Sequence, residues 1–159
     1  MSTPVTIIMI EDDDGHARLI ERNIRRSGVN NDIIPFTNGT AAVNYLFGSD
    51  GTGLDHRGQA LLILLDLNLP DMTGIDILRR VKENKYLKCA PVVVLTTTDD
   101  SQEIKRCYEL GCNVYITKPV TTKASPTPSA SSGCSSPSFR YRQPPPHEFR
   151  NPHPAVYRR

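Results

Sequence analysis

In this 159-residue sequence, carboxylate, hydroxyl and ammonium side chains that could take part in a reaction follow short runs of mostly apolar residues. Asp66 follows one such run, the acidic cluster 11–14 follows another, and Thr96 and Lys118 end two more. Carboxylates that share a site repel one another unless a cation or a base offsets their charge. Carboxylate oxygens are also the ligands that Mg²⁺ prefers. These residue types therefore predict a Mg²⁺ site with room for water and phosphate.

The apolar runs have the length and composition of buried strands. Residues 61–65 are five consecutive aliphatic residues without a helical period, which is typical of a strand covered on both faces. Because ligands of open α/β sheets bind beyond the carboxyl ends of the strands, Asp66 lies where chemistry is expected. For Asp66 alone, a residue that only caps a turn is the simpler interpretation. The three other strand ends favour a shared site.

Helical segments alternate with these strands, which predicts five strands and four helices between residues 4 and 120. The first helix begins near Asp14, which we expect to be its N-cap. Pro35 makes the strand at 31–36 an edge strand. A third helix is expected at 74–82, and the capping-box pattern at 100–103 opens the fourth.

Composition changes after residue 120. Residues 121–159 hold 8 of the 13 prolines, and their six Lys and Arg against one Glu give a charge of +5. The formal charge of the whole chain is +2, so residues 1–120 carry −3. We expect one folded domain at 1–120 and a tail at 121–159 that has no regular structure.

Several functional classes are disfavoured. The chain shows no signal sequence and no apolar run of membrane-spanning length, so we expect a cytoplasmic protein without a membrane partner. No DNA-binding motif follows residue 120, and no nucleic acid is expected as partner. The four cysteines lack the spacing of zinc ligands, which favours reduced thiols. The glycine-rich stretch 48–58 follows no strand, so we expect an insertion rather than a phosphate-binding loop.

Four motifs, taken together and in this order, resemble the receiver domains of two-component response regulators. They are Ile10-Glu11-Asp12-Asp13, Leu64-Leu65-Asp66-Leu67-Asn68-Leu69-Pro70, Val94-Leu95-Thr96-Thr97 and Lys118-Pro119. The resemblance covers about residues 4–120. It implies a flavodoxin-like, doubly wound, five-stranded parallel sheet of order 2-1-3-4-5, with the switch point between strands 1 and 3.

The resemblance also implies a role for each position of the site. Asp66 would accept a phosphoryl group from a sensor histidine kinase, in a reaction that needs Mg²⁺. Asp12 and Asp66 would bind the metal directly, Glu11 would act through a bound water, and Asn68 would offer its backbone carbonyl oxygen. The protein would catalyse only its own phosphorylation and dephosphorylation, and would otherwise not be an enzyme.

Three further positions match groups that respond to the phosphoryl group. Thr96 and Lys118 would each contact a phosphoryl oxygen, and the bond before Pro119 is cis in the family. Tyr115 matches an aromatic switch whose rotamer follows Thr96. The alternative interpretation, which has equal weight, is that Tyr115 is an aromatic residue that only packs in its strand.

Two other functional classes remain open. An aspartyl-nucleophile phosphatase needs a second Asp two residues after the nucleophile as general acid, but that position is Asn68. A pure interaction module would instead use the tail, whose prolines 144–146 fit a polyproline ligand. Within the receiver family, the long loop 48–60 is similar to that of the stand-alone regulators that pair with bacterial phytochrome kinases. Such regulators signal by protein contacts.

The tail departs from the family pattern, which requires a fifth helix after Lys118-Pro119. Three prolines and a Ser-rich stretch exclude a helix at 121–140. Back-translation of 121–140 with one added base permits an amphipathic helix with Phe, Ile and Leu at helical spacing. A frameshift and a natural divergent tail are therefore the two interpretations. With the fifth helix intact, a homodimer through the strand 4–strand 5 and C-terminal face is expected.

Overall fold

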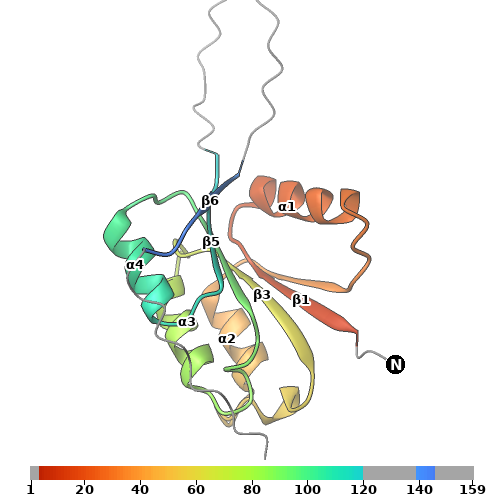
Figure 1. Ribbon diagram of the computed structural model, residues 1–159. Coiled ribbons are helices and arrows are strands. Elements are labelled where there is room, and N and C mark those ends of the chain that lie inside the picture. The colour runs from red at the N-terminus through yellow and green to blue at the C-terminus, as the bar shows by residue number, and fades with distance from the viewer. Residues whose placement is uncertain (1–3, 120–138, 146–159) are drawn as a thin grey trace, which may run out of the picture.

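The computed structural model describes residues 4–119 and 139–145, which form a sheet with helices on both faces (Figure 1). Five parallel strands stand in the order β2-β1-β3-β4-β5, which confirms the predicted flavodoxin-like order. The strands are β1 (Val5–Ile10), β2 (Ile33–Phe36), β3 (Ala60–Leu65), β4 (Val92–Thr96) and β5 (Val114–Thr117). As Pro35 predicted, β2 lies at the edge.

A sixth strand, β6 (Arg140–Arg142), extends this sheet beyond the five predicted strands. It pairs antiparallel with β5, with Ile116 opposite Tyr141. The hydroxyl group of Tyr108 donates to the carbonyl oxygen of Arg142 and holds the strand in place. Three residues are too few for a recognisable alternation of polar and apolar side chains, so the sequence pattern did not reveal this strand.

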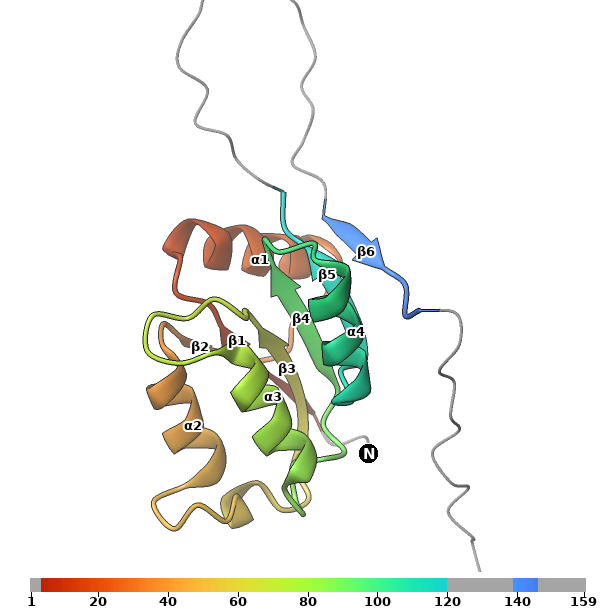
Figure 2. The ribbon, with the colours of Figure 1, turned by 90° about the vertical axis from the view of Figure 1, so that its left-hand side faces the viewer.

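The helices are distributed unevenly over the two faces of the sheet (Figure 2). Helices α2, α3 and α4 cover one face, whereas α1 lies on the other. The bounds are α1 (Asp14–Arg26), α2 (Gly39–Phe47), α3 (Gly74–Glu83) and α4 (Ser101–Glu109), with a 3₁₀ helix, η1 (Leu54–His56), in the loop before β3. Within the described ranges, no helix is long and apolar enough to cross a membrane.

Two helix caps differ from the sequence prediction. The N-cap of α1 is Asp13, not Asp14, because Asp13 has extended backbone angles and its carboxylate accepts from the amide of His16. At α4, Asp100 accepts from the amide of Gln102. Glu103 accepts instead from the hydroxyl group of Tyr115, so a tertiary contact replaces part of the expected capping box.

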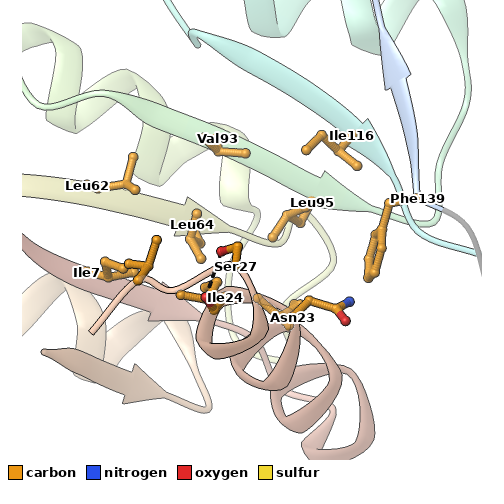
Figure 3. Close-up of a pocket in the computed structure, with 12 residues that line it drawn as sticks. Ile7, Asn23, Ile24, Ser27, Leu62, Leu64, Val93, Leu95, Ile116 and Phe139 are labelled. Atoms are coloured by element: carbon orange, nitrogen blue, oxygen red, sulfur yellow. Dashed lines mark hydrogen bonds between the residues drawn. The ribbon is translucent and has the colours of Figure 1, made fainter. Parts of the chain in front are cut away.

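The face of the sheet that α1 covers carries an apolar groove of about 330 Å³ (Figure 3). It lies between α1 and the neighbouring strands, and Phe139, just before β6, closes one side. Ile20, Ile24 and Ile116 are among the residues that line this groove. The strands β1, β3, β4 and β5 therefore bury this face less completely than the face beneath α2, α3 and α4.

Candidate phosphoacceptor and metal site

Backbone hydrogen bonds place the site residues just beyond the strands. The parallel pairing continues past β3, where the amide of Asp66 donates to the carbonyl oxygen of Ile10 at 2.9 Å. It continues past β5 as well, where the amide of Lys118 donates to the carbonyl oxygen of Thr96 at 2.8 Å. The positions of Asp66 and Lys118 are therefore determined by the sheet rather than by loop conformation alone.

A buried ionic group forms the centre of the site. Nζ of Lys118 donates to Oδ2 of Asp66 at 2.8 Å and to Oε2 of Glu11. The three residues are only 3%, 5% and 3% exposed, in the order Lys118, Asp66 and Glu11. Burial raises the pKa of Glu11, and the hydrogen bond from Lys118 opposes that shift. Each of the three charged groups is therefore stabilised by its partners, because an unpaired buried charge raises the free energy of the folded state.

Three carboxylates converge where a metal site was predicted. Ligand oxygens of Glu11, Asp12 and Asp66 all lie within 4.8 Å of one another. Glu11 and Asp66 are buried, whereas Asp12 is exposed and borders an open groove beside loop 67–73. A single ammonium group, that of Lys118, lies against the two buried carboxylates. This set of hard oxygen donors, with one side open, fits Mg²⁺ or a similar divalent cation that keeps several waters.

Asn68 connects Asp66 to Thr96. Its backbone amide donates to Oδ1 of Asp66, and its side-chain Nδ2 donates to Oγ1 of Thr96, both at 3.1 Å. Thr96 is fully buried, and its hydroxyl group also accepts from the amide of Thr98 at 3.4 Å. The structure therefore brings together Asp66, Asn68 and Thr96, although their metal and phosphoryl roles stay predictions.

Tyr115 is fully buried beneath α4. Its hydroxyl group donates to the carbonyl oxygen of Thr98 at 3.0 Å and to Oε1 of Glu103 at 3.2 Å. Burial raises the pKa of Tyr115, and the charge of Glu103 adds to the shift. Tyr115 thus packs in the core and contacts the main chain two residues after Thr96, while its role as a switch stays a prediction.

The peptide bond before Pro119 departs from the family pattern. The described residues contain no cis peptide bond, so this bond is trans and the implied cis bond is wrong for this structure. The trans form is the ordinary one, since it is favoured by about 0.5–1 kcal/mol before proline.

One residue near the site was missed by the sequence analysis. Asp71, five residues after Asp66, accepts hydrogen bonds from the amides of Gly39 and Thr40 and from the hydroxyl group of Thr40. The hydroxyl group of Thr40 is the largest cause that lowers the pKa of Asp71 to about 2. An acidic residue directly after Pro70 is the only sequence signal, and it predicts a turn rather than a contact with another helix.

The chain matches the response regulator receiver domain family over residues 7–125. It is 71% identical to a crystal structure of a response regulator receiver domain from Rhodospirillum rubrum, with a TM-score of 0.72 over 73% of this chain and 82% of that chain. Response regulator Rcp1 from Synechocystis sp. is 36% identical over 115 residues, or 72% of this chain and 77% of Rcp1.

Two solved structures extend these comparisons to states of the site. The Mn²⁺-bound form of Rcp1 is 33% identical, with a TM-score of 0.63, over 76% of this chain and 84% of that chain. The phosphorylated cyanobacterial phytochrome response regulator RcpA is also 33% identical, with a TM-score of 0.64 and the same coverage. With the family match, the sheet order and the convergent carboxylates agreeing, this chain belongs to the receiver-domain family of two-component response regulators.

Proposed function

We propose that this receiver accepts a phosphoryl group from a sensor histidine kinase on Asp66 and signals through phosphorylation-dependent protein contacts. The observation that carries the proposal is the position of the Asp66 carboxylate, between Lys118 and Asn68 and within 4.8 Å of two further carboxylates. An oxygen of Asp66 would attack phosphorus, and the bond from phosphorus to the donor's histidine nitrogen would break. An acyl phosphate and a free imidazole would result.

The chain's own groups suit the charges of this transfer. Lys118 already contacts Oδ2 of Asp66 and can turn its ammonium group to a phosphoryl oxygen bound there. Oγ1 of Thr96 accepts from Asn68 and Thr98, so its own proton remains available to a second phosphoryl oxygen. Positioning and electrostatic stabilisation of this kind carry most of the catalysis of phosphoryl transfer.

Mg²⁺ is the cation that we propose for the carboxylates. Glu11, Asp12 and Asp66 would hold it with the backbone carbonyl oxygen of Asn68, and Asp12 forms the open side through which it would enter. When bound, the metal would neutralise phosphoryl oxygens during transfer. The Mn²⁺-bound form of Rcp1 supports a divalent cation in a relative.

The proposed kinase is a bacteriophytochrome. RcpA, a phytochrome response regulator solved in its phosphorylated form, supports this assignment.

We propose a cytoplasmic protein, with neither nucleic acid nor membrane as partner. A homodimer through β4, β5 and the C-terminal face belongs to a chain with a fifth helix, since β6 covers the outer edge of β5 here.

The two competing functions find less support in the site. The amide of Asn68 donates to Thr96 and cannot protonate a leaving group, as a phosphatase of this type requires. An interaction module that acts through its proline-rich tail would not need the buried ionic group at the strand ends.

Labelling with radioactive acetyl phosphate tests the proposal. The wild type should take up one phosphoryl group in the presence of Mg²⁺ and none after chelation. Asp66→Asn should abolish uptake, whereas Asp76→Asn, an exposed carboxylate on α3, should label like the wild type. Undiminished labelling of Asp66→Asn, or labelling that needs no divalent cation, would refute the proposed chemistry.

A further inference from the structure

The loop after the phosphoacceptor, residues 67–73, is held at its base by main-chain contacts. Asn68 and Thr73 form an antiparallel bridge, and the amide of Gly74 donates to the carbonyl oxygen of Leu67 at 2.9 Å. A Cβ atom at Gly74 would lie 2.3 Å from the carbonyl oxygen of Asp66, so α3 begins directly against the main chain of the acceptor. The base of this loop therefore packs directly against the main chain that follows β3, beside Asp66 and Asn68.

Asp71 joins the tip of the loop to the beginning of α2. Its Oδ1 accepts from the amide of Gly39 at 2.8 Å, and its Oδ2 accepts from the amide of Thr40 at 2.7 Å and from the hydroxyl group of Thr40. Met72 packs beside these bonds, so closely that a Cβ atom at Gly39 would lie 2.3 Å from its Cγ. A polar contact and a close steric contact thus hold the same two segments together.

The beginning of α2 is tied in turn to the opposite side of the site. The amide of Glu11 donates to the carbonyl oxygen of Phe36, at the end of β2, at 2.9 Å. Asn38 then caps α2 by accepting from the amide of Ala41. A continuous series of contacts therefore runs from the acidic residues after β1, through the β2–α2 turn, to Asp71 and the loop. Asp12 and this loop border an open groove of about 490 Å³.

We propose that Asp71 is a positioning residue that fixes the width of this groove and so the spacing of the groups that receive the divalent cation and the phosphodonor. This inference rests on the proposed function of the site. Asp71 touches neither Asp66 nor Lys118 in the described contacts and acts through Gly39 and Thr40. The simpler alternative is that Asp71 only caps α2, in which case it would stabilise the fold without influencing the site.

Metal binding and labelling separate the two roles. The variants are Asp71→Ala, Thr40→Val, their combination and the conservative Thr40→Ser. Asp50→Ala is the matched control, since Asp50 makes a similar pair of bonds to the amide and hydroxyl group of Thr52 in a loop away from the site. Calorimetry gives the dissociation constant for Mn²⁺ alone, acetyl phosphate gives the labelling rate, and thermal unfolding gives the stability.

Asp71→Ala removes all three hydrogen bonds and should weaken Mn²⁺ binding and slow labelling about tenfold, as the loss of groups that orient metal ligands does. Thr40→Val removes only the bond from the hydroxyl group and should have a smaller effect in the same direction. The combination should be no worse than Asp71→Ala alone, because that variant already removes every bond to Thr40. Thr40→Ser and Asp50→Ala should behave like the wild type. Gly39→Ala, which displaces Met72 sterically, should weaken Mn²⁺ binding in the same direction.

Unchanged Mn²⁺ binding and labelling in Asp71→Ala, with a lower unfolding temperature alone, would overturn the inference and leave Asp71 as a cap. If Asp71→Ala does not fold, Asp71→Asn keeps an oxygen for Gly39 and decides the same question. A wild type that binds Mn²⁺ but takes no label would refute the proposed phosphoryl transfer, while the Mn²⁺ constants would still decide the role of Asp71.

Discussion

Lys118 determines the charge balance of the site, because its ammonium group is the buried cation that Glu11 and Asp66 share. The resemblance to receivers predicted Lys118 as a contact of the phosphoryl group. The structure shows that, in addition, the same side chain lies almost fully buried between two carboxylates. We therefore expect Lys118 to contribute to folding, in addition to its predicted role as a contact of the phosphoryl group.

Replacing Lys118 should therefore cost stability. Lys118→Ala leaves Glu11 and Asp66 buried without their cation, and breaking a buried pair in this way costs about 3–5 kcal/mol. Urea unfolding without divalent cations should show the loss, and added Mg²⁺ should reduce it by binding the folded state.

A second substitution provides the control for this prediction. Glu11→Gln in the Lys118→Ala background removes one of the two unpaired charges, so it should recover part of the lost stability. If the Lys118→Ala variant unfolds at the same urea concentration as the wild type, the ionic group does not stabilise the fold. If Glu11→Gln lowers stability further, charge repulsion is not the cause.

Tyr115 should make folding sensitive to alkaline pH. Burial raises its pKa above the ordinary value of 10.0, so its contribution is present below pH 10 and is lost as the pH rises above it. The stability of the wild type, measured by urea unfolding at pH 8 and pH 10.5, should fall more steeply than that of Tyr115→Phe.

The variant should keep some pH dependence. Burial also raises the pKa values of Cys107, Cys112 and Tyr108 to about 12, so these groups contribute in the same direction. Equal decreases in the wild type and Tyr115→Phe would show that the Tyr115 hydroxyl group is not shielded from solvent in the folded protein.

At the scale of elements, the site depends on how closely α3 begins behind β3. Gly74 is the first residue of α3, and a Cβ atom there would lie 2.3 Å from the carbonyl oxygen of Asp66 and 2.7 Å from Cα of Leu67. Both are main-chain atoms, so no side chain can move aside. The absence of a side chain at Gly74 thus lets α3 approach the main chain of Asp66. The backbone conformation does not require glycine here, since Gly74 is not among the residues with a positive φ angle.

Gly74→Ala should destabilise the protein by about 2 kcal/mol, because forced overpacking costs about 1–3 kcal/mol and exceeds the gain of at most about 1 kcal/mol in helix propensity. Chemical unfolding measures the change, and labelling with acetyl phosphate should slow because the acceptor is displaced. Gly15→Ala in α1 is the comparison, since its nearest atom is the end of the Asp13 side chain at 3.1 Å. If Gly74→Ala is as stable as Gly15→Ala, α3 can shift without strain.

At the scale of the whole molecule, the uneven cover of the sheet is the main feature. Within the described residues, three helices pack on one face, and the other has α1 and an apolar groove of about 330 Å³ (Figure 3). A fifth helix is what the family resemblance requires on this side. Residues 120–138, where that helix would lie, are outside the described residues. From the sequence, we propose that the tail at 121–159 results from a shift of reading frame near residue 120.

A chain with the frame restored should unfold at a higher temperature than this one. Each large apolar side chain that a helix buries contributes about 1.5–3 kcal/mol, against a total domain stability of about 5–15 kcal/mol. Binding of the dye ANS to the groove should fall at the same time, because the helix would cover Ile24, Ile116 and their neighbours. Thermal unfolding of both chains and the coding DNA around codons 120–121 check the prediction. Equal stability, with no base missing in the gene, would make the tail a genuine feature.

From the sequence alone, the apolar runs and the polar residues that end them predicted a parallel sheet with a candidate site at one edge. The resemblance to receiver domains predicted the order of the strands. Parallel strands bring their carboxyl ends to one edge of the sheet irrespective of the conformation of the loops. The topology therefore makes neighbours of the residues at these ends, which are Glu11, Asp12, Asp66, Thr96 and Lys118. Contacts between segments that are distant in sequence needed the tertiary structure.

Asp71 meets Thr40 across 31 residues, and β6 pairs with β5 after an intervening stretch of 22 residues, at 118–139. Neither contact leaves a periodic pattern, because each depends on where two folded segments come to lie rather than on local spacing. The burial of Lys118 between two carboxylates belongs to the same class: the sequence predicts the three groups at one edge, but only packing determines that solvent is excluded from them.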